Sequence, residues 1–143
     1  MIPFLNLKKI NAAYEDAFQD KLKSVLASGW YVLGNEVKAF ETQFAAYCNA
    51  KYCIGVGNGF DALVLLFKGY LQLGKLQKGD EVIVPANTFI ASILAIMEAG
   101  LVPVLVEPKL ETYNLNPDLI SGKITFKTKA VLAVHLYGQL AEM

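Results

Sequence analysis

Hydrophobic positions in the first fifty residues recur at helical spacing. Over residues 11–28 the large apolar side chains stand on one side of a helical pattern, with charged residues between them: Tyr14, Phe18, Leu22, Val25 and Leu26. This is the pattern of an amphipathic helix, and Gly29 is typical of its end. Residues 36–50 repeat the pattern. Residues 1–50 are therefore expected to form an N-terminal helical segment.

The remainder of the chain alternates apolar runs with helical patterns. Four strands are expected: one from Tyr52, one ending at Pro85, and two over residues 101–106 and 129–135. Longer helical patterns follow the first two strands, and a short one is expected near residues 117–121. Each strand is a nearly continuous apolar run, which is typical of a parallel sheet that is buried on both faces. The predicted fold class is α/β, with a mostly parallel sheet covered by helices on both faces.

Composition narrows the possible partners. The chain has 143 residues, enough for one domain, and its 13 basic and 13 acidic residues give a formal net charge of zero. No basic cluster is present, which argues against nucleic acid or an anionic membrane as a partner. The 55% hydrophobic content suggests that a partner subunit or further chain covers part of the apolar surface.

Other features bear on location and metals. Cys48 and Cys53 have no nearby histidine or third cysteine, so no metal site is expected. The N-terminal residues lack the organisation of a signal peptide. The longest uncharged stretch, residues 82–97, is interrupted by Pro85 and is too short to span a bilayer. A soluble, cytoplasmic protein is expected.

A glycine-rich turn follows the expected strand at Tyr52. Gly55, Gly57 and Gly59 alternate with other residues, and a helical pattern begins directly after them. Such a turn brings backbone N–H groups and the positive end of a helix dipole to one place, which favours a phosphate group. The dinucleotide fingerprint G-x-G-x-x-G is not met. Similar turns also occur in α/β proteins that bind nothing there, so both interpretations stay open.

The carboxyl ends of parallel strands meet at one edge of a sheet, where ligands bind. Residues 58–61, 86–89 and 135–139 follow expected strands and are predicted to converge there. Phe89 either stacks on a flat ring or packs in the core. His135, the only histidine, is either an acid, base or ring partner, or a hydrogen-bonded structural residue.

Several of these segments resemble one known family. GVGNGFDAL, KGDEVIVPANTFIASILAIMEAGLVPVLVE, TYNLNP and KAVLAVHLYGQLAEM are similar to the DegT/DnrJ family of pyridoxal-phosphate-dependent sugar-nucleotide aminotransferases. The segments IPFLNL and SGWYVLGNEVKAFE match its N-terminal region. Within the family, NGFDAL and VPANTFIA look most like enzymes that aminate C3 of dTDP-3-oxo-6-deoxyhexoses.

The resemblance implies a fold-type I, aspartate aminotransferase-like large domain, of which residues 51–143 would be the N-terminal part. It implies that the backbone around Gly59, Phe60 and Asp61 holds the phosphate of pyridoxal phosphate, and that Phe89 stacks on its ring. The Asp61 side chain would have a structural role in the first helical turn.

The resemblance also implies a substrate and an assembly. The enzyme would transfer an amino group, from glutamate, to a keto sugar linked to a nucleotide, and would form a homodimer. The loop between the two N-terminal helices carries Trp30 and Tyr31, which either pack or line a site. They are the candidates for the sugar-nucleotide pocket.

The lysine that forms the Schiff base and the aspartate that protonates the pyridine nitrogen lie, in the family, beyond the matching residues. No lysine of these 143 residues occupies a plausible position for that role, so no catalytic residue is predicted here and the segment alone is expected to be inactive. Two alternatives stay open: a sugar-nucleotide dehydratase of the same fold, in which histidine replaces the lysine, and a non-catalytic α/β binding module.

Overall fold

The structure is a computed structural model that describes residues 3–143, and it divides into two compact units. The first ends at Gly55 and the second begins at Val56. Each unit is described separately below. In the described residues, no helix combines the length and the hydrophobicity needed to cross a membrane.

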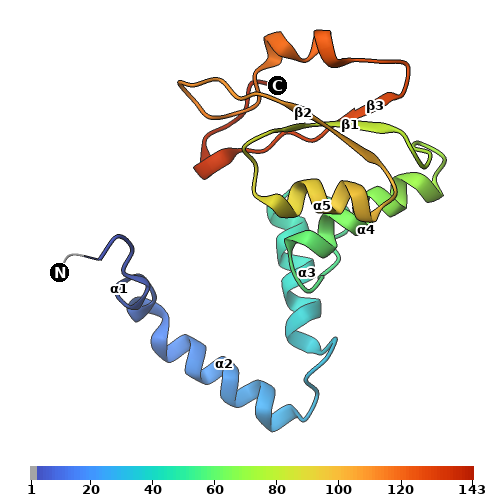
Figure 1. Cartoon of the computed structure of the whole chain (residues 1–143). Coiled ribbons are helices and arrows are strands. Elements are labelled where there is room, and N and C mark those ends of the chain that lie inside the picture. The colour runs from blue at the N-terminus through green and yellow to red at the C-terminus, as the bar shows by residue number, and fades with distance from the viewer. Residues whose placement is uncertain (1–2) are drawn as a thin grey trace. The chain divides into compact units, whose positions relative to one another are not determined.

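The first unit is helical (Figure 1). Its elements are α1 (Leu7–Asn11), the 3₁₀ turn η1 (Ala12–Tyr14), α2 (Glu15–Ser28) and α3 (Asn35–Tyr47). The helices expected over residues 11–28 and 36–50 are confirmed. Gly29 ends α2 with a φ of +64°, a left-handed conformation that glycine adopts without steric cost. An exposed ion pair of 2.9 Å between Lys21 and Glu36 joins the two longer helices.

The prediction of a strand from Tyr52 is wrong. In the structure residues 51–58 contain no strand. A strand requires a ladder of backbone hydrogen bonds to a neighbouring strand. Here the N–H of Gly55 instead donates to Oε1 of Glu41 in α3, at 2.7 Å. A side-chain carboxylate has taken the donor that a ladder would use, and the sheet has three strands in the described residues.

The second unit contains a parallel sheet and two long helices. In chain order its elements are α4 (Gly59–Gln72), β1 (Glu81–Pro85), α5 (Ile90–Glu98), β2 (Val102–Val106), the 3₁₀ turns η2 (Pro117–Leu119) and η3 (Ser121–Lys123), β3 (Thr128–Val131) and η4 (Leu136–Gly138). The strand order is β2-β1-β3, and both pairings are parallel. The predicted α/β class with a parallel sheet is confirmed.

The last strand ends earlier than expected. The apolar run predicted a strand to residue 135, but β3 ends at Val131. The N–H of Leu132 still donates to the carbonyl of Ile83 at 2.8 Å. Beyond that bond the chain leaves β1 and turns into η4. A continuous apolar sequence therefore does not define the extent of the ladder, and residues 132–135 are half-buried or exposed.

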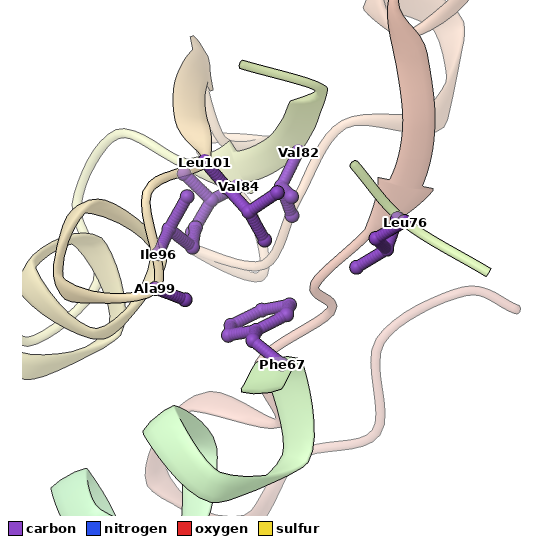
Figure 2. Close-up of a cluster of buried hydrophobic side chains, with 7 residues drawn as sticks. All are labelled: Phe67, Leu76, Val82, Val84, Ile96, Ala99 and Leu101. Carbon is purple, nitrogen blue, oxygen red and sulfur yellow. The ribbon is translucent and has the colours of Figure 1, made fainter. Parts of the chain in front are cut away.

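The central strand β1 separates two apolar clusters. On one face, Val82 and Val84 pack with side chains from α4, α5 and the segments that follow these helices, as Figure 2 shows: Phe67, Leu76, Ile96, Ala99 and Leu101. On the other face, Ile83 packs with Val106 and Leu115. Alternate residues of β1 thus point to opposite faces, and both faces are covered, the first by α4 and α5 and the second by the segment that follows β2 (Figure 1).

Phe67 is the largest side chain of the first cluster, and only 4% of its surface is exposed. We predict that Phe67→Ala lowers the free energy of unfolding by about 3–5 kcal/mol, because it removes a buried ring and leaves a cavity. Urea unfolding followed by circular dichroism measures this change. Leu73→Ala, at a position that is 72% exposed, is the control and should change stability by less than about 0.5 kcal/mol. Equal losses in both variants would contradict the assigned core.

Glu81, at the first position of β1, accepts two hydrogen bonds across the sheet. The hydroxyl groups of Thr125 and Thr128 donate to its Oε2 at 2.7 and 2.9 Å. These bonds lower the pKa of the Glu81 carboxyl, with a smaller contribution from the charge of Lys127. Because the folded-state pKa is depressed, the carboxylate stabilises the fold above the unfolded-state pKa, and this stabilisation is lost as the pH falls through the folded-state value.

We predict that Thr128→Val raises the pKa of Glu81 toward its ordinary value of 4.5, because one of the two donors is removed. The measurement is the titration of the Glu81 carboxyl carbon by NMR. Thr42→Val is the matched control, since the Thr42 hydroxyl bonds only to the Lys38 carbonyl in its own helix. An unchanged Glu81 titration in Thr128→Val would show that these hydrogen bonds do not set its pKa.

Candidate functional site

Three loops and two helix N-termini lie at the carboxyl edge of the sheet. The strands are parallel, so the segments after β1, β2 and β3 leave from one edge. Helix α5 begins five residues after β1, at that edge. Helix α4 leads through residues 73–80 into the start of β1, so its N-terminus points back toward the same edge. Ligands of open parallel sheets bind at this edge.

The N-terminus of α4 is capped by Asn58. Its Oδ1 accepts from the N–H of Asp61 at 3.0 Å, and its Nδ2 donates to Oδ2 of Asp61 at 3.0 Å. Asn58 and Asp61 therefore close a local ring of two hydrogen bonds. The aspartate side chain faces the capping residue, and its negative charge stands in the first turn, where the helix dipole favours it.

This cap leaves two helix donors free. Within residues 3–143 the N–H groups of Gly59 and Phe60 make no hydrogen bond, whereas the N–H of Asp61 is occupied. A Cβ added at Gly59 would meet no atom within 4 Å, so the approach to these donors is open. At Gly57 an added Cβ would lie 3.0 Å from Oδ2 of Asp61, so a larger residue there would crowd the Asp61 carboxylate. Two adjacent N–H groups at the start of a 14-residue helix fit a phosphate group.

Phe89 occupies the N-cap position of α5 and is 77% exposed. It belongs to neither buried cluster, so packing in the core is excluded for this chain's described residues. Neither Asn87 nor Thr88, the two polar residues before it, caps α5. The Asn87 amide donates to the carbonyl of Tyr113 at 2.9 Å, and the Thr88 hydroxyl bonds to that of Ser92 at 3.0 Å. With both side chains engaged elsewhere, the chain enters the helix at Phe89 without a side-chain cap.

Trp30 and Tyr31 lie in the first unit and line one pocket of about 370 Å³. The indole Nε1 donates to the carbonyl of Val32 at 2.6 Å, which fixes the ring. The ammonium of Lys38 lies 5.9 Å from the centre of that ring. Both aromatic side chains remain about two-thirds exposed. The pocket therefore offers an aromatic wall, which suits a flat ligand. Lys38 lies outside the pocket lining, whereas Glu36 lies within it and pairs with Lys21.

His135 makes a structural contact. Its Nδ1 accepts a hydrogen bond from the backbone N–H of Ala141 at 3.1 Å. This bond requires that Nδ1 carries no proton, and it bends residues 135–141 into a closed loop.

The sequence reasoning missed two asparagines. Asn58 could have been found, because asparagine directly before a helical pattern is a common N-cap. Asn114 is 3% exposed, and its amide bonds three backbone groups that are more than twenty positions away along the chain. Such distant partners cannot be read from spacing. No group of three or more possible metal ligands occurs in the described residues.

Comparison with known proteins places this site in context. Residues 13–143 match the DegT/DnrJ/EryC1/StrS aminotransferase family. Over 143 residues the chain is 57% identical to a dTDP-3-amino-3,6-dideoxy-alpha-D-galactopyranose transaminase of Aneurinibacillus thermoaerophilus, covering all of this chain and 38% of that protein. The chain thus spans well under half the length of that relative.

Two solved structures are similar to this chain in fold. The crystal structure of S. venezuelae DesV in complex with a ketimine intermediate superposes with a TM-score of 0.87 at 43% identity, over 99% of this chain and 37% of that one. A GDP-4-keto-6-deoxymannose-3-dehydratase with a trapped PLP-glutamate geminal diamine superposes with a TM-score of 0.78 at 33% identity, over 84% and 32%. The chain belongs to the DegT/DnrJ/EryC1/StrS aminotransferase family.

Proposed function

We propose that the protein transfers an amino group from glutamate to the keto sugar of a nucleotide-linked 6-deoxyhexose, with pyridoxal phosphate as cofactor. The observation that carries this proposal is the 57% identity to a dTDP-amino-sugar transaminase over all 143 residues. Family membership over residues 13–143 supports amino transfer as the reaction class. The free N–H groups at the start of α4 and the exposed ring of Phe89 are compatible with a phosphorylated, flat cofactor.

The residues of this chain would bind and orient the cofactor. The N–H groups of Gly59 and Phe60 would donate to its phosphate, and the dipole of α4 would add to their attraction. Asp61 would act through its pairing with Asn58, which fixes the turn that presents those donors. Phe89 would cover one face of the ring and exclude water from it. Pyridoxal phosphate, when bound, supplies an electron sink that allows an amino group to leave the donor and join a ketone carbon.

The first unit would contribute side chains that bind the sugar nucleotide. Trp30 and Tyr31 line a pocket whose aromatic wall suits the flat base of a nucleotide. We further propose a cytoplasmic homodimer. In the described part of the first unit Ala45 is the one buried residue, while aromatic side chains such as Phe18 and Phe40 are more than half exposed. A second subunit would cover such apolar faces.

This chain covers 38% of its transaminase relative, so the decisive experiment uses a form of the protein that spans the full length of that relative. It is supplied with pyridoxal phosphate, ¹⁵N-labelled glutamate and a dTDP-3-oxo-6-deoxyhexose. We expect ¹⁵N in the sugar nucleotide by mass spectrometry and one equivalent of 2-oxoglutarate for each amino sugar formed. The amino group of glutamate replaces the ketone oxygen of the sugar, which leaves as water, and water supplies the keto oxygen of 2-oxoglutarate. Both products must therefore appear together. A protein that forms neither product while it binds pyridoxal phosphate would contradict amino transfer.

A dehydratase is the second candidate, because a GDP-4-keto-6-deoxymannose-3-dehydratase is among the similar solved structures. The same experiment separates the two reactions. A dehydratase product has lost a hydroxyl group from the sugar and has gained no nitrogen. That outcome would replace the aminotransferase proposal and leave the cofactor proposal intact.

We predict that Phe89→Ala raises the dissociation constant of pyridoxal phosphate about three- to tenfold, because an aromatic stacking contact is worth about 0.5–1.5 kcal/mol. Titration of the protein with the cofactor, followed by absorbance, measures this change. Phe126→Ala is the matched control, since Phe126 is 84% exposed and precedes β3 at the opposite edge of the sheet. Equal affinities in Phe89→Ala and the unmodified protein would remove Phe89 from the binding site.

A further inference from the structure

Three loops leave the carboxyl edge of the sheet, and side-chain amides tie them together. The segment after β1 is joined to the segment after β2 by the bond from Nδ2 of Asn87 to the carbonyl of Tyr113. The segment after β2 is a hairpin, residues 107–116, closed by an antiparallel bridge between Pro108 and Leu115. It carries Asn114, which contacts the segment after β3. No pair of these loops is adjacent in the sequence.

Asn114 uses all of its amide in this contact. Its Oδ1 accepts from the N–H of Leu136 at 3.0 Å, and its Nδ2 donates to the carbonyls of Gln139 and Leu140, each at 3.1 Å. It is the one buried polar side chain of the described residues. An unpaired amide at such a depth would be unfavourable, and so would three unpaired backbone groups. Loss of this contact would therefore leave several polar groups unpaired at once.

Two further contacts close the segment that Asn114 holds, residues 135–142. The Ala141 N–H donates to Nδ1 of His135. The ammonium of Lys109, on the hairpin, lies 2.9 Å from a carboxylate oxygen of Glu142. The hydrogen bond to Glu142 raises the pKa of Lys109.

The held segment carries a side chain in an unfavourable backbone conformation. Tyr137 has a φ of +54° and is 95% exposed. For a residue with a Cβ this left-handed conformation costs about 1–2 kcal/mol, so neighbouring contacts must maintain it. Tyr137 lies between Leu136 and Gln139, both of which bond to Asn114. The contact with Asn114 thus presents Tyr137 at the edge of the sheet.

We infer that Asn114 is a positioning residue, which fixes residues 135–142 and, through its hairpin and Asn87, the loop that carries Phe89, so that the three loops of the carboxyl edge form one rigid rim. The role of Asn114 in cofactor binding rests on the proposed function. The rigidity of the rim does not depend on that function. A ligand that binds at this edge meets preorganised loops and loses less of its binding energy in ordering them.

The test replaces Asn114 by leucine, which has a similar volume and none of the three hydrogen bonds. The readout is amide hydrogen exchange at Ala141, whose N–H bonds to His135 and not to Asn114. We expect exchange at Ala141 to become at least about tenfold faster, because the loss of buried hydrogen bonds opens the whole segment. Exchange at Ala141 that equals the unmodified protein would overturn the inference.

A conservative variant guards against failure to fold. Asn114→Asp keeps an acceptor for Leu136 and loses both donors. We expect it to preserve protection of the Leu136 amide while Ala141 exchanges faster. Asn116→Asp is the matched control two positions away, because Asn116 caps only the local turn through the N–H of Asp118. Equal exchange at Ala141 in Asn114→Asp and Asn116→Asp would also overturn the inference.

A second measurement tests whether the rim contributes to the binding of pyridoxal phosphate. Asn87→Ala removes the bond to Tyr113 at an exposed position, so the fold should persist. We expect the dissociation constant of pyridoxal phosphate to rise about threefold or more with an unchanged circular dichroism spectrum. Unchanged affinity would refute a positioning role toward the cofactor. If the unmodified protein binds no pyridoxal phosphate, the proposed function fails, and exchange at Ala141 still decides whether Asn114 holds the segment.

Discussion

The second unit depends on the burial of β1. This strand is paired on both edges, with β2 and with β3, and it is covered on both faces. Its residues Val82, Ile83 and Val84 have no exposed surface. A strand in that position has no freedom to slip, because a shift of one residue would exchange the side chains of the two apolar clusters. The exits of the three strands, and the loops that follow them, are fixed as a consequence.

The burial of β1 also explains why the polar side chains that form hydrogen bonds lie at the ends of the strands. Backbone groups within β1 are satisfied by the ladder, whereas those beyond Pro85 need other partners. The first such group, the N–H of Ala86, donates to the carbonyl of Val106. The side-chain amides of Asn87 and Asn114 bond backbone groups in the loops after β2 and β3. Asparagine suits this task because one amide both donates and accepts. The carboxyl edge is thus held together by hydrogen bonds, while the body of the sheet is held by apolar packing.

Much of this arrangement could be predicted from the sequence, and the exceptions share a cause. The helices and the strands β1 and β2 follow from periodicity and from continuous apolar runs, although β1 is far more buried than β2. The expected strand at Tyr52 and the extension of β3 failed because pairing depends on which neighbour is present, and no local pattern records that. Asn114 escaped notice for the same reason. The residues proposed for the cofactor came from a resemblance, and the N–H groups of Gly59 and Phe60 became visible as free donors only with the cap of Asn58 in place.

The helix start at Phe89 lacks the stabilisation that a polar N-cap residue would provide. The N-cap of a helix is the position where serine, threonine, aspartate or asparagine contributes about 1 kcal/mol, and a large apolar ring contributes nothing to the free helix donors. The protein places an exposed phenylalanine there, beside an asparagine and a threonine that are committed elsewhere. A substitution that optimised this helix would thereby erase the ring. Selection for thermal stability alone would drive this position away from phenylalanine, so its retention in stabilised variants would be a sign of selection for ligand binding.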